Sequence, residues 1–192
     1  TKDISDRLKF YEKLNKENLF LEGFVVQHEK LNKFCDTCVN TLRIMTFNYG
    51  DESKILFAAL RVGNGTASVD NFHKGGMGVL VDLETGELIG DAIDKALNHY
   101  KEHPKTKVKF AGFKIPNWEI VKKTVLEASK VNQNIHVVGW DVAITSKGCT
   151  FIEGNRRPGF DLVQVLSERG RKDIMRDVFA SINEKEDKNY KI

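Results

Sequence analysis

Three oxygen-bearing side chains late in the sequence have the spacing of a metal site. Asp141 lies in one apolar run, and Glu153 and Asn155 lie in or just after the next, so the turn between the runs brings all three together. Glu153 and Asn155 are two residues apart, which places them on one face of a strand. Carboxylate and amide oxygens suit Mg²⁺, which keeps waters or phosphate oxygens as its other ligands. The spacing predicts a magnesium site; the alternative is two solvated strand carboxylates and a turn-forming Asn155.

Two arginines stand among the apolar residues of predicted strands, Arg43 and Arg61. Because an unpaired buried charge is costly, each is expected to meet an anion. The planar fork of a guanidinium group suits phosphate or carboxylate oxygens. The alternative is an ion pair within the chain, to Asp70, Asp141 or Glu153.

Cys35 and Cys38 form a Cys-x-x-Cys pair without a second pair in the sequence. His28 is the only histidine nearby, so the sequence supports neither a four-ligand zinc site nor a thioredoxin-like redox site. Cys149 precedes a predicted strand and is expected to be packed. A total of three cysteines does not suit a secreted fold held by disulfides.

The elements that must position these side chains are predicted from apolar periodicity and turn residues. Three antiparallel hairpins are expected, 41–47 with 54–62, 78–82 with 87–90, and 135–144 with 150–152. The apolar run 19–26 predicts a buried strand. Helices are expected from Asp3 or Ser5 to Asn15, over 118–131, over 161–169 and over 172–183. The fold class is therefore α+β, a mainly antiparallel sheet flanked by helices.

Composition favours a single unit of 1–192, with a leading helix (1–18), a core (19–183) and a charged tail (184–192). The formal charge is only +3, which gives no support for nucleic-acid binding. No stretch approaches the roughly 20 consecutive apolar residues that a membrane span needs, and the first residues do not open a signal peptide. We expect a soluble, cytoplasmic protein without a nucleic-acid or membrane partner.

Several motifs carry a resemblance to a known family. The segments Trp140-Asp141-x-Ala143 and Ile152-Glu153-x-Asn155-x-x-Pro158-Gly159 resemble the closing motif of ATP-grasp ligases. More narrowly, the chain resembles the sugar-transfer-associated ATP-grasp group, relatives of α-L-glutamate ligases, in Val39–Ile44, Val69–Asn71 with Gly75-Gly76, His103-Pro104, Gly112–Trp118 and Gly139–Asp141. The resemblance implies that ATP and Mg²⁺ are the cofactors and that Asp141, Glu153 and Asn155 hold magnesium.

The resemblance also implies a nucleotide-binding segment early in the chain. The residues around Glu22 look like the ATP-grasp hinge strand, in which Glu22 and the following backbone groups of Phe24 and Val25 recognise the adenine edge. Glu29 or His28 would meet the ribose. The alternatives are a strand-edge charge for Glu22 and a solvated helix residue for Glu29.

Arg43 and Arg61 resemble the family's residues that steady the transferred phosphate and the acyl-phosphate. Asn71, in a glycine-rich loop that resembles the substrate-side loop of these ligases, would orient a phosphate or carboxylate, because glycines let backbone N–H groups approach an anion closely. A plain flexible loop is the alternative.

The function implied is an ATP- and Mg²⁺-dependent carboxylate–amine ligase that acts through an acyl-phosphate on small-molecule carboxylate and amine substrates. By analogy within the group, it would belong to cell-surface polysaccharide biosynthesis. The alternative is a non-catalytic nucleotide- or glycan-binding remnant. Nothing before Leu19 supplies the strand lysines and glycine-rich flap of an upstream lobe. We therefore expect a C-terminal portion that is inactive alone and whose partner is the N-terminal lobe of the same enzyme.

Overall fold

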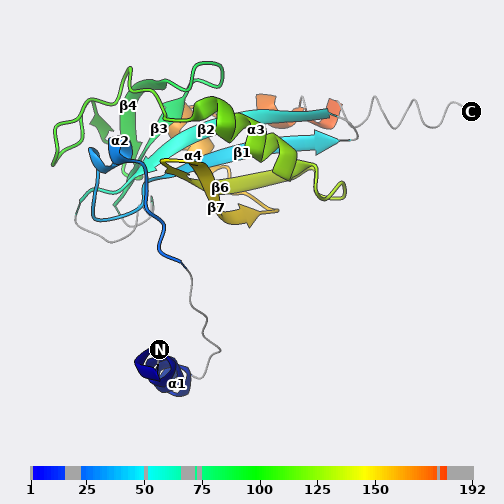
Figure 1. Cartoon of the computed structure of the whole chain (residues 1–192). Coiled ribbons are helices and arrows are strands. Elements are labelled where there is room, and N and C mark those ends of the chain that lie inside the picture. The colour runs from blue at the N-terminus through cyan, green and yellow to red at the C-terminus, as the bar shows by residue number, and fades with distance from the viewer. Residues whose placement is uncertain are drawn as a thin grey trace, which may run out of the picture.

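The core of the protein is one antiparallel seven-stranded sheet (Figure 1). The computed structural model describes residues 2–15, 23–49, 52–65, 72, 75–176 and 178–180. In spatial order the strands are β5 (His99–Tyr100), β4 (Leu88–Asp94), β3 (Met77–Val81), β2 (Glu52–Val62), β1 (Thr41–Tyr49), β6 (Val137–Thr145) and β7 (Gly148–Asn155). The α+β fold class predicted from the sequence is confirmed.

All three predicted hairpins are present. β1 pairs with β2, β3 with β4, and β6 with β7, and β1 also pairs with β6 across the middle of the sheet. That last pairing joins segments about a hundred residues apart, as in Thr41 opposite Ala143. Chain-distant pairing therefore places the first and third hairpins side by side.

The sheet separates two hydrophobic cores, because side chains alternate between its faces along each strand. Leu42 and Ile44 of β1 face a core that α3 (Trp118–Ser129) covers with Val121 and Val125. Met45 of β1 faces the second core, which α4 (Asp161–Ser167) covers. In Figure 1, α3 lies in front of the sheet and α4 behind it.

The contact between α4 and the sheet depends on Gly78 of β3. A Cβ atom at this position would lie 2.9 Å from Leu166 Cδ1 and 3.2 Å from Leu162 Cδ1. Helical residues 172–176 and 178–180 follow α4, and Ile174 joins the same core. The expected helices are confirmed, although α4 ends at Ser167.

The first predicted helix is also present, as α1 (Lys2–Asn15), which lies apart from the sheet in Figure 1. It begins before its predicted caps, so Asp3 sits in the first turn, where it pairs with Arg7 at 3.3 Å.

The predicted buried strand over 19–26 is wrong for the part that the structure describes. Residues 23–28 have no strand partner, and Phe24 is 89% exposed. Apolar residues predict burial only where a neighbour covers them, and this segment makes a single backbone hydrogen bond to the sheet, from His28 N to Ile144 O at 2.7 Å. A short unpredicted helix, α2 (Glu29–Asn32), follows it.

No helix in the described part of the chain is both long and apolar enough to cross a membrane.

Candidate active site

Three adjacent strands gather the predicted charged residues on one face of the sheet. Arg43 of β1 lies opposite Asp141 of β6, and Asp141 lies opposite Glu153 of β7. Arg61 of β2 lies opposite Thr41, two residues before Arg43. Because direct cross-strand partners point to the same side, these side chains share the face that α4 covers.

Asp141 is the centre of this group and is only 5% exposed. Its closest contact is Arg43 Nε, 2.8 Å from Oδ1, while the aligned hydrogen bond from Arg43 is Nη2 to Oδ2 at 3.3 Å. The shorter contact is therefore an ion pair without hydrogen-bond alignment. Arg61 Nη1 donates to Oδ2 at 3.2 Å, and Arg61 Nε donates to Thr41 Oγ1 at 3.1 Å.

The alternative stated for the arginines, an ion pair within the chain, is thus present for both of them. Asp141 therefore places one carboxylate between two guanidinium groups. The planar geometry of a guanidinium group also suits phosphate or carboxylate oxygens of a ligand.

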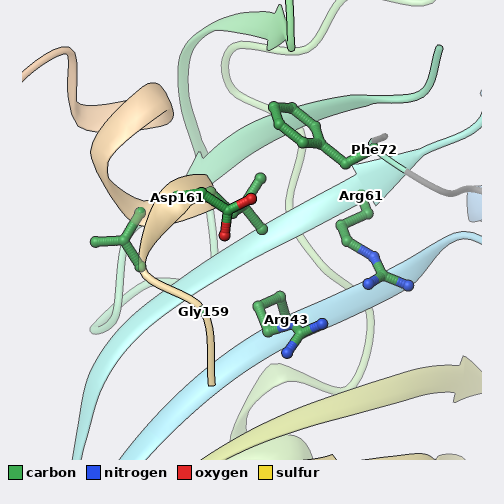
Figure 2. A pocket seen from close by; sticks show the side chains of 7 residues that line it. Arg43, Arg61, Phe72, Gly159 and Asp161 are labelled. Atoms are coloured by element: carbon green, nitrogen blue, oxygen red, sulfur yellow. The ribbon is translucent and has the colours of Figure 1, made fainter. Parts of the chain in front are cut away.

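A small pocket of about 80 Å³ opens beside the arginines. Figure 2 shows the side chains of Arg43 and Arg61 along adjacent strands, with Phe72 and the α4 residue Asp161 across from them. Gly159 and the first turn of α4 close the remaining side. The pocket is therefore built around two guanidinium groups by residues from two distant parts of the chain, 43–72 and 159–163.

Gly139 of β6 allows the chain after β7 to approach this site. A Cβ atom there would lie 2.6 Å from Pro158 Cβ and 3.2 Å from Arg43 Nη1. No substitution fits without moving either the segment that leads to Gly159 or the guanidinium group. This close packing explains why the Gly139-Trp140-Asp141 motif begins with glycine.

Glu153 and Asn155 differ from Asp141 in having no side-chain partner. Register places Asn155 opposite Gly139, so it shares the face of Asp141 and Glu153. Glu153 is exposed and Asn155 half-buried, and neither side chain makes a hydrogen bond or ion pair with other described residues. Their oxygens are available to a cation.

The side chains on this face carry oxygen donors that suit a magnesium ion, and one of them, Asp141, also pairs with the arginines. Two carboxylates and an amide on adjacent strands are oxygen ligands of the kind Mg²⁺ prefers. Within the described residues, no cluster of three or more His, Cys, Asp and Glu side chains is placed to hold a metal. The predicted magnesium ligands include only two residues of these types, Asp141 and Glu153, because the third is Asn155.

The predicted nucleotide-binding segment borders a second hollow. Phe24 and Val25 line it together with Gln27 and the loop from Asp36 to Val39, around a space of about 350 Å³. His28 caps α2, since its Nδ1 accepts a hydrogen bond from Lys30 N at 3.2 Å. Glu29 is exposed in the first turn of α2.

A buried amide network that sequence reasoning missed connects this hollow to the arginine strands. Asn40 is fully buried, and its Nδ2 donates to Gln27 Oε1 at 3.0 Å and to Cys35 O at 2.9 Å. Its Oδ1 accepts from Gly63 N at 3.3 Å, just after Arg61. The signal was present, because Asn40 belongs to a motif that carries the family resemblance, but a polar residue before a strand reads equally well as a turn.

Phe72, Gly159 and Asp161 were also not predicted as pocket residues. They are brought to the arginines only by tertiary packing. Glu22 and Asn71, which were predicted to contact adenine and substrate, lie outside the described residues.

A comparison with protein families gives a match over most of the chain. The family described as sugar-transfer associated ATP-grasp matches residues 10–179, which include all of the predicted site residues. No curated protein and no solved structure matches the chain.

Proposed function

The chain belongs to the sugar-transfer associated ATP-grasp family, and from this premise we propose that it serves an ATP- and Mg²⁺-dependent carboxylate–amine ligase. Its substrates are a small-molecule carboxylate and an amine, in the synthesis of a cell-surface polysaccharide. The observation that carries the proposal is the pair of arginines that share Asp141 and line a pocket.

The proposed reaction has two steps. An oxygen of the substrate carboxylate attacks the γ-phosphorus of ATP, the bond to the bridging oxygen breaks, and ADP leaves. The amine nitrogen then attacks the carbonyl carbon of the acyl-phosphate, inorganic phosphate leaves, and the nitrogen loses a proton. Both steps pass through states rich in oxygen-borne negative charge.

The arginines are suited to that charge because their positions are fixed before any ligand arrives. Asp141 holds both guanidinium groups, and Thr41 Oγ1 orients Arg61 from the opposite strand. Donors that are already oriented stabilise developing charge without a reorganisation cost at the moment of reaction. Arg43 and Arg61 would therefore hold the transferred phosphate and the carboxylate in line.

Glu153 and Asn155, with Asp141, would hold magnesium, which when bound neutralises charge on the phosphate oxygens. The location supports this, because β7 lies two strands from Arg43 in the same sheet face. The hollow beside Phe24 and Val25 would take the adenine.

The test is the substitution Glu153→Gln in the protein that carries this chain. It keeps the size of the side chain and removes the charge that a divalent cation requires. We expect Mg²⁺-dependent formation of ADP and phosphate to fall at least 100-fold, consistent with a loss of about 2.7 kcal/mol or more of transition-state stabilisation, while the unfolding midpoint is unchanged.

Glu127→Gln is the matched control, because Glu127 is an exposed carboxylate of α3 on the other face of the sheet. Its activity is expected to equal that of the wild type. Turnover that survives in Glu153→Gln would contradict the metal assignment.

A second candidate function is a non-catalytic nucleotide- or glycan-binding domain. The observation in its favour is that Asp141 already lies between two arginines, which lowers its availability to a metal. Product analysis separates the two. Formation of ADP and phosphate that depends on an added amine supports the ligase, and nucleotide binding without turnover supports the binding domain.

A further inference from the structure

The Cys-x-x-Cys segment has a geometry that its sequence did not reveal. The Sγ atoms of Cys35 and Cys38 lie 3.3 Å apart, and both side chains are buried. Neither is joined in a disulfide, and neither belongs to the arginine pocket. Two thiols are therefore held in contact outside the arginine pocket, and one of them, Cys38, lines the hollow proposed for adenine.

Hydrogen bonds from two neighbouring side chains hold the backbone around the two thiols. Gln27 Nε2 donates to Cys35 O at 2.9 Å and to Cys38 O at 2.8 Å, and Asn40 Nδ2 donates to Cys35 O at 2.9 Å. Two buried amide side chains thus hold the loop so that its sulfur atoms face one another. A disulfide bond is roughly 2.05 Å long, so the sulfur atoms must approach by about 1.2 Å to form one.

The surroundings also favour the thiolate of Cys35. Burial raises the pKa of this thiol, but hydrogen bonds from Thr37 and from Cys38 together outweigh burial, and the pKa is lowered overall. Burial raises the pKa of Cys149. Because the thiolate is the reactive form, Cys35 is the more nucleophilic of these two thiols at neutral pH.

One of the two cysteines borders a hollow. Cys38 lines the hollow of about 350 Å³ beside Phe24 and Val25. Because Cys35 Sγ lies 3.3 Å from Cys38 Sγ, a small oxidant such as hydrogen peroxide in this hollow would lie near both sulfur atoms.

We propose that Cys35 and Cys38 are a peroxide-sensitive modification site that forms a reversible intramolecular disulfide. The Cys35 thiolate attacks one peroxide oxygen, the O–O bond breaks, and the leaving hydroxide takes a proton to become water. The Cys38 sulfur then attacks the sulfenic sulfur of Cys35, the S–O bond breaks, and the hydroxyl group leaves as water with the proton of Cys38. Overall, two thiols lose two electrons and two protons, and one peroxide becomes two waters.

Hydrogen bonds connect the cysteine loop to the segment proposed to bind the nucleotide. Gln27 belongs to residues 23–28, and its amide accepts from Asn40 while it donates to both cysteine carbonyls. A disulfide that draws the two sulfur atoms together acts on the loop that lines the hollow. The proposal itself concerns the thiols and does not depend on the ligase function.

The experiment treats the 192-residue wild-type chain with hydrogen peroxide, followed by intact mass measurement and alkylation after denaturation. We expect the mass to fall by two hydrogen atoms and the number of alkylated thiols to fall from three to one. Peptide mapping should show Cys35 linked to Cys38, and dithiothreitol should restore all three thiols. Three remaining thiols, accumulation of sulfinic acid at Cys35, or chains crosslinked through Cys149 would overturn the proposal.

Two variants complete the test. Cys149→Ser should lose the same two hydrogen atoms at the wild-type rate. Cys35→Ser should not lose them, and a loss in this variant would mean that Cys38 reacts with Cys149 instead. The main measurement uses the unsubstituted chain, so a variant that fails to fold leaves the wild-type result decisive.

Discussion

Asp141 differs from Glu153 although both were predicted as metal ligands. Asp141 is buried between Arg43 and Arg61, whereas the Glu153 carboxylate is exposed and makes no hydrogen bond or ion pair with described residues. The two carboxylates are cross-strand neighbours on β6 and β7. Their surroundings differ because β6 also pairs with β1, which places Arg43 beside Asp141. Within the proposed site, Asp141 positions the arginines, and Glu153 is available to the cation.

Replacing Asp141 tests this at the residue scale. Asp141→Asn keeps the shape but removes the carboxylate charge that the two guanidinium groups share, which is expected to cost up to about 3 kcal/mol of stability. Urea unfolding measures the loss. Asp3→Asn is the control, because the Asp3–Arg7 pair is more than 70% exposed on both sides and surface pairs contribute about 0–1 kcal/mol. Equal losses in the two variants would contradict the central role of Asp141.

Helix α4 completes the pocket, and its position depends on a close approach to the sheet. Leu162 and Leu166 of α4 pack over Gly78 of β3, where no Cβ is present. The same helix carries Asp161 into the pocket wall. Packing between α4 and β3 therefore sets the width of the pocket beside Arg43 and Arg61.

A double-mutant cycle tests this contact at the element scale. Gly78→Ala is expected to destabilise the protein by about 1–3 kcal/mol, because its Cβ overlaps Leu166. Leu166→Ala alone should cost about 2–5 kcal/mol through a cavity. In the double variant the new methyl group occupies part of that cavity, so the combined loss in urea unfolding should be smaller than the sum. Additive losses would show that the two positions do not touch.

Over the whole molecule, a single sheet is shared by two cores. The core under α3 and the core under α4 contact opposite faces of the same strands, with Leu42 and Met45 of β1 as examples. Neither core persists without the sheet, because β1, β2, β3, β4 and β6 each contribute residues to both cores. The molecule should therefore unfold as one cooperative unit.

This cooperativity is tested by weakening each core separately. Val125→Ala removes buried volume under α3, and Leu166→Ala does so under α4, each at a cost of about 2 kcal/mol or more. We expect both to lower the midpoint of the same single transition, measured by circular dichroism and tryptophan fluorescence together. Two separate transitions in either variant would mean that the faces unfold independently.

The sequence by itself determined the hairpins, helix α3 and the family, because these depend on local periodicity, turn residues and short motifs. It also placed Asp141, Glu153 and Asn155 on one face, since a hairpin and a two-residue spacing are local facts. The prediction of a buried strand over 19–26 was wrong for the residues that the structure describes, because apolar composition does not reveal whether a neighbouring strand is present.

Only the tertiary structure decided what surrounds these residues. Asp141 meets Arg43 and Arg61 across separations of 98 and 80 residues, where the sequence left Asp70, Asp141 and Glu153 as candidate partners. Asp70 lies outside the described residues. The same holds for the pocket wall from α4 and for the amide network that brings the two cysteine sulfur atoms together. Pairing between distant strands sets these contacts, and no local pattern in the sequence encodes that pairing.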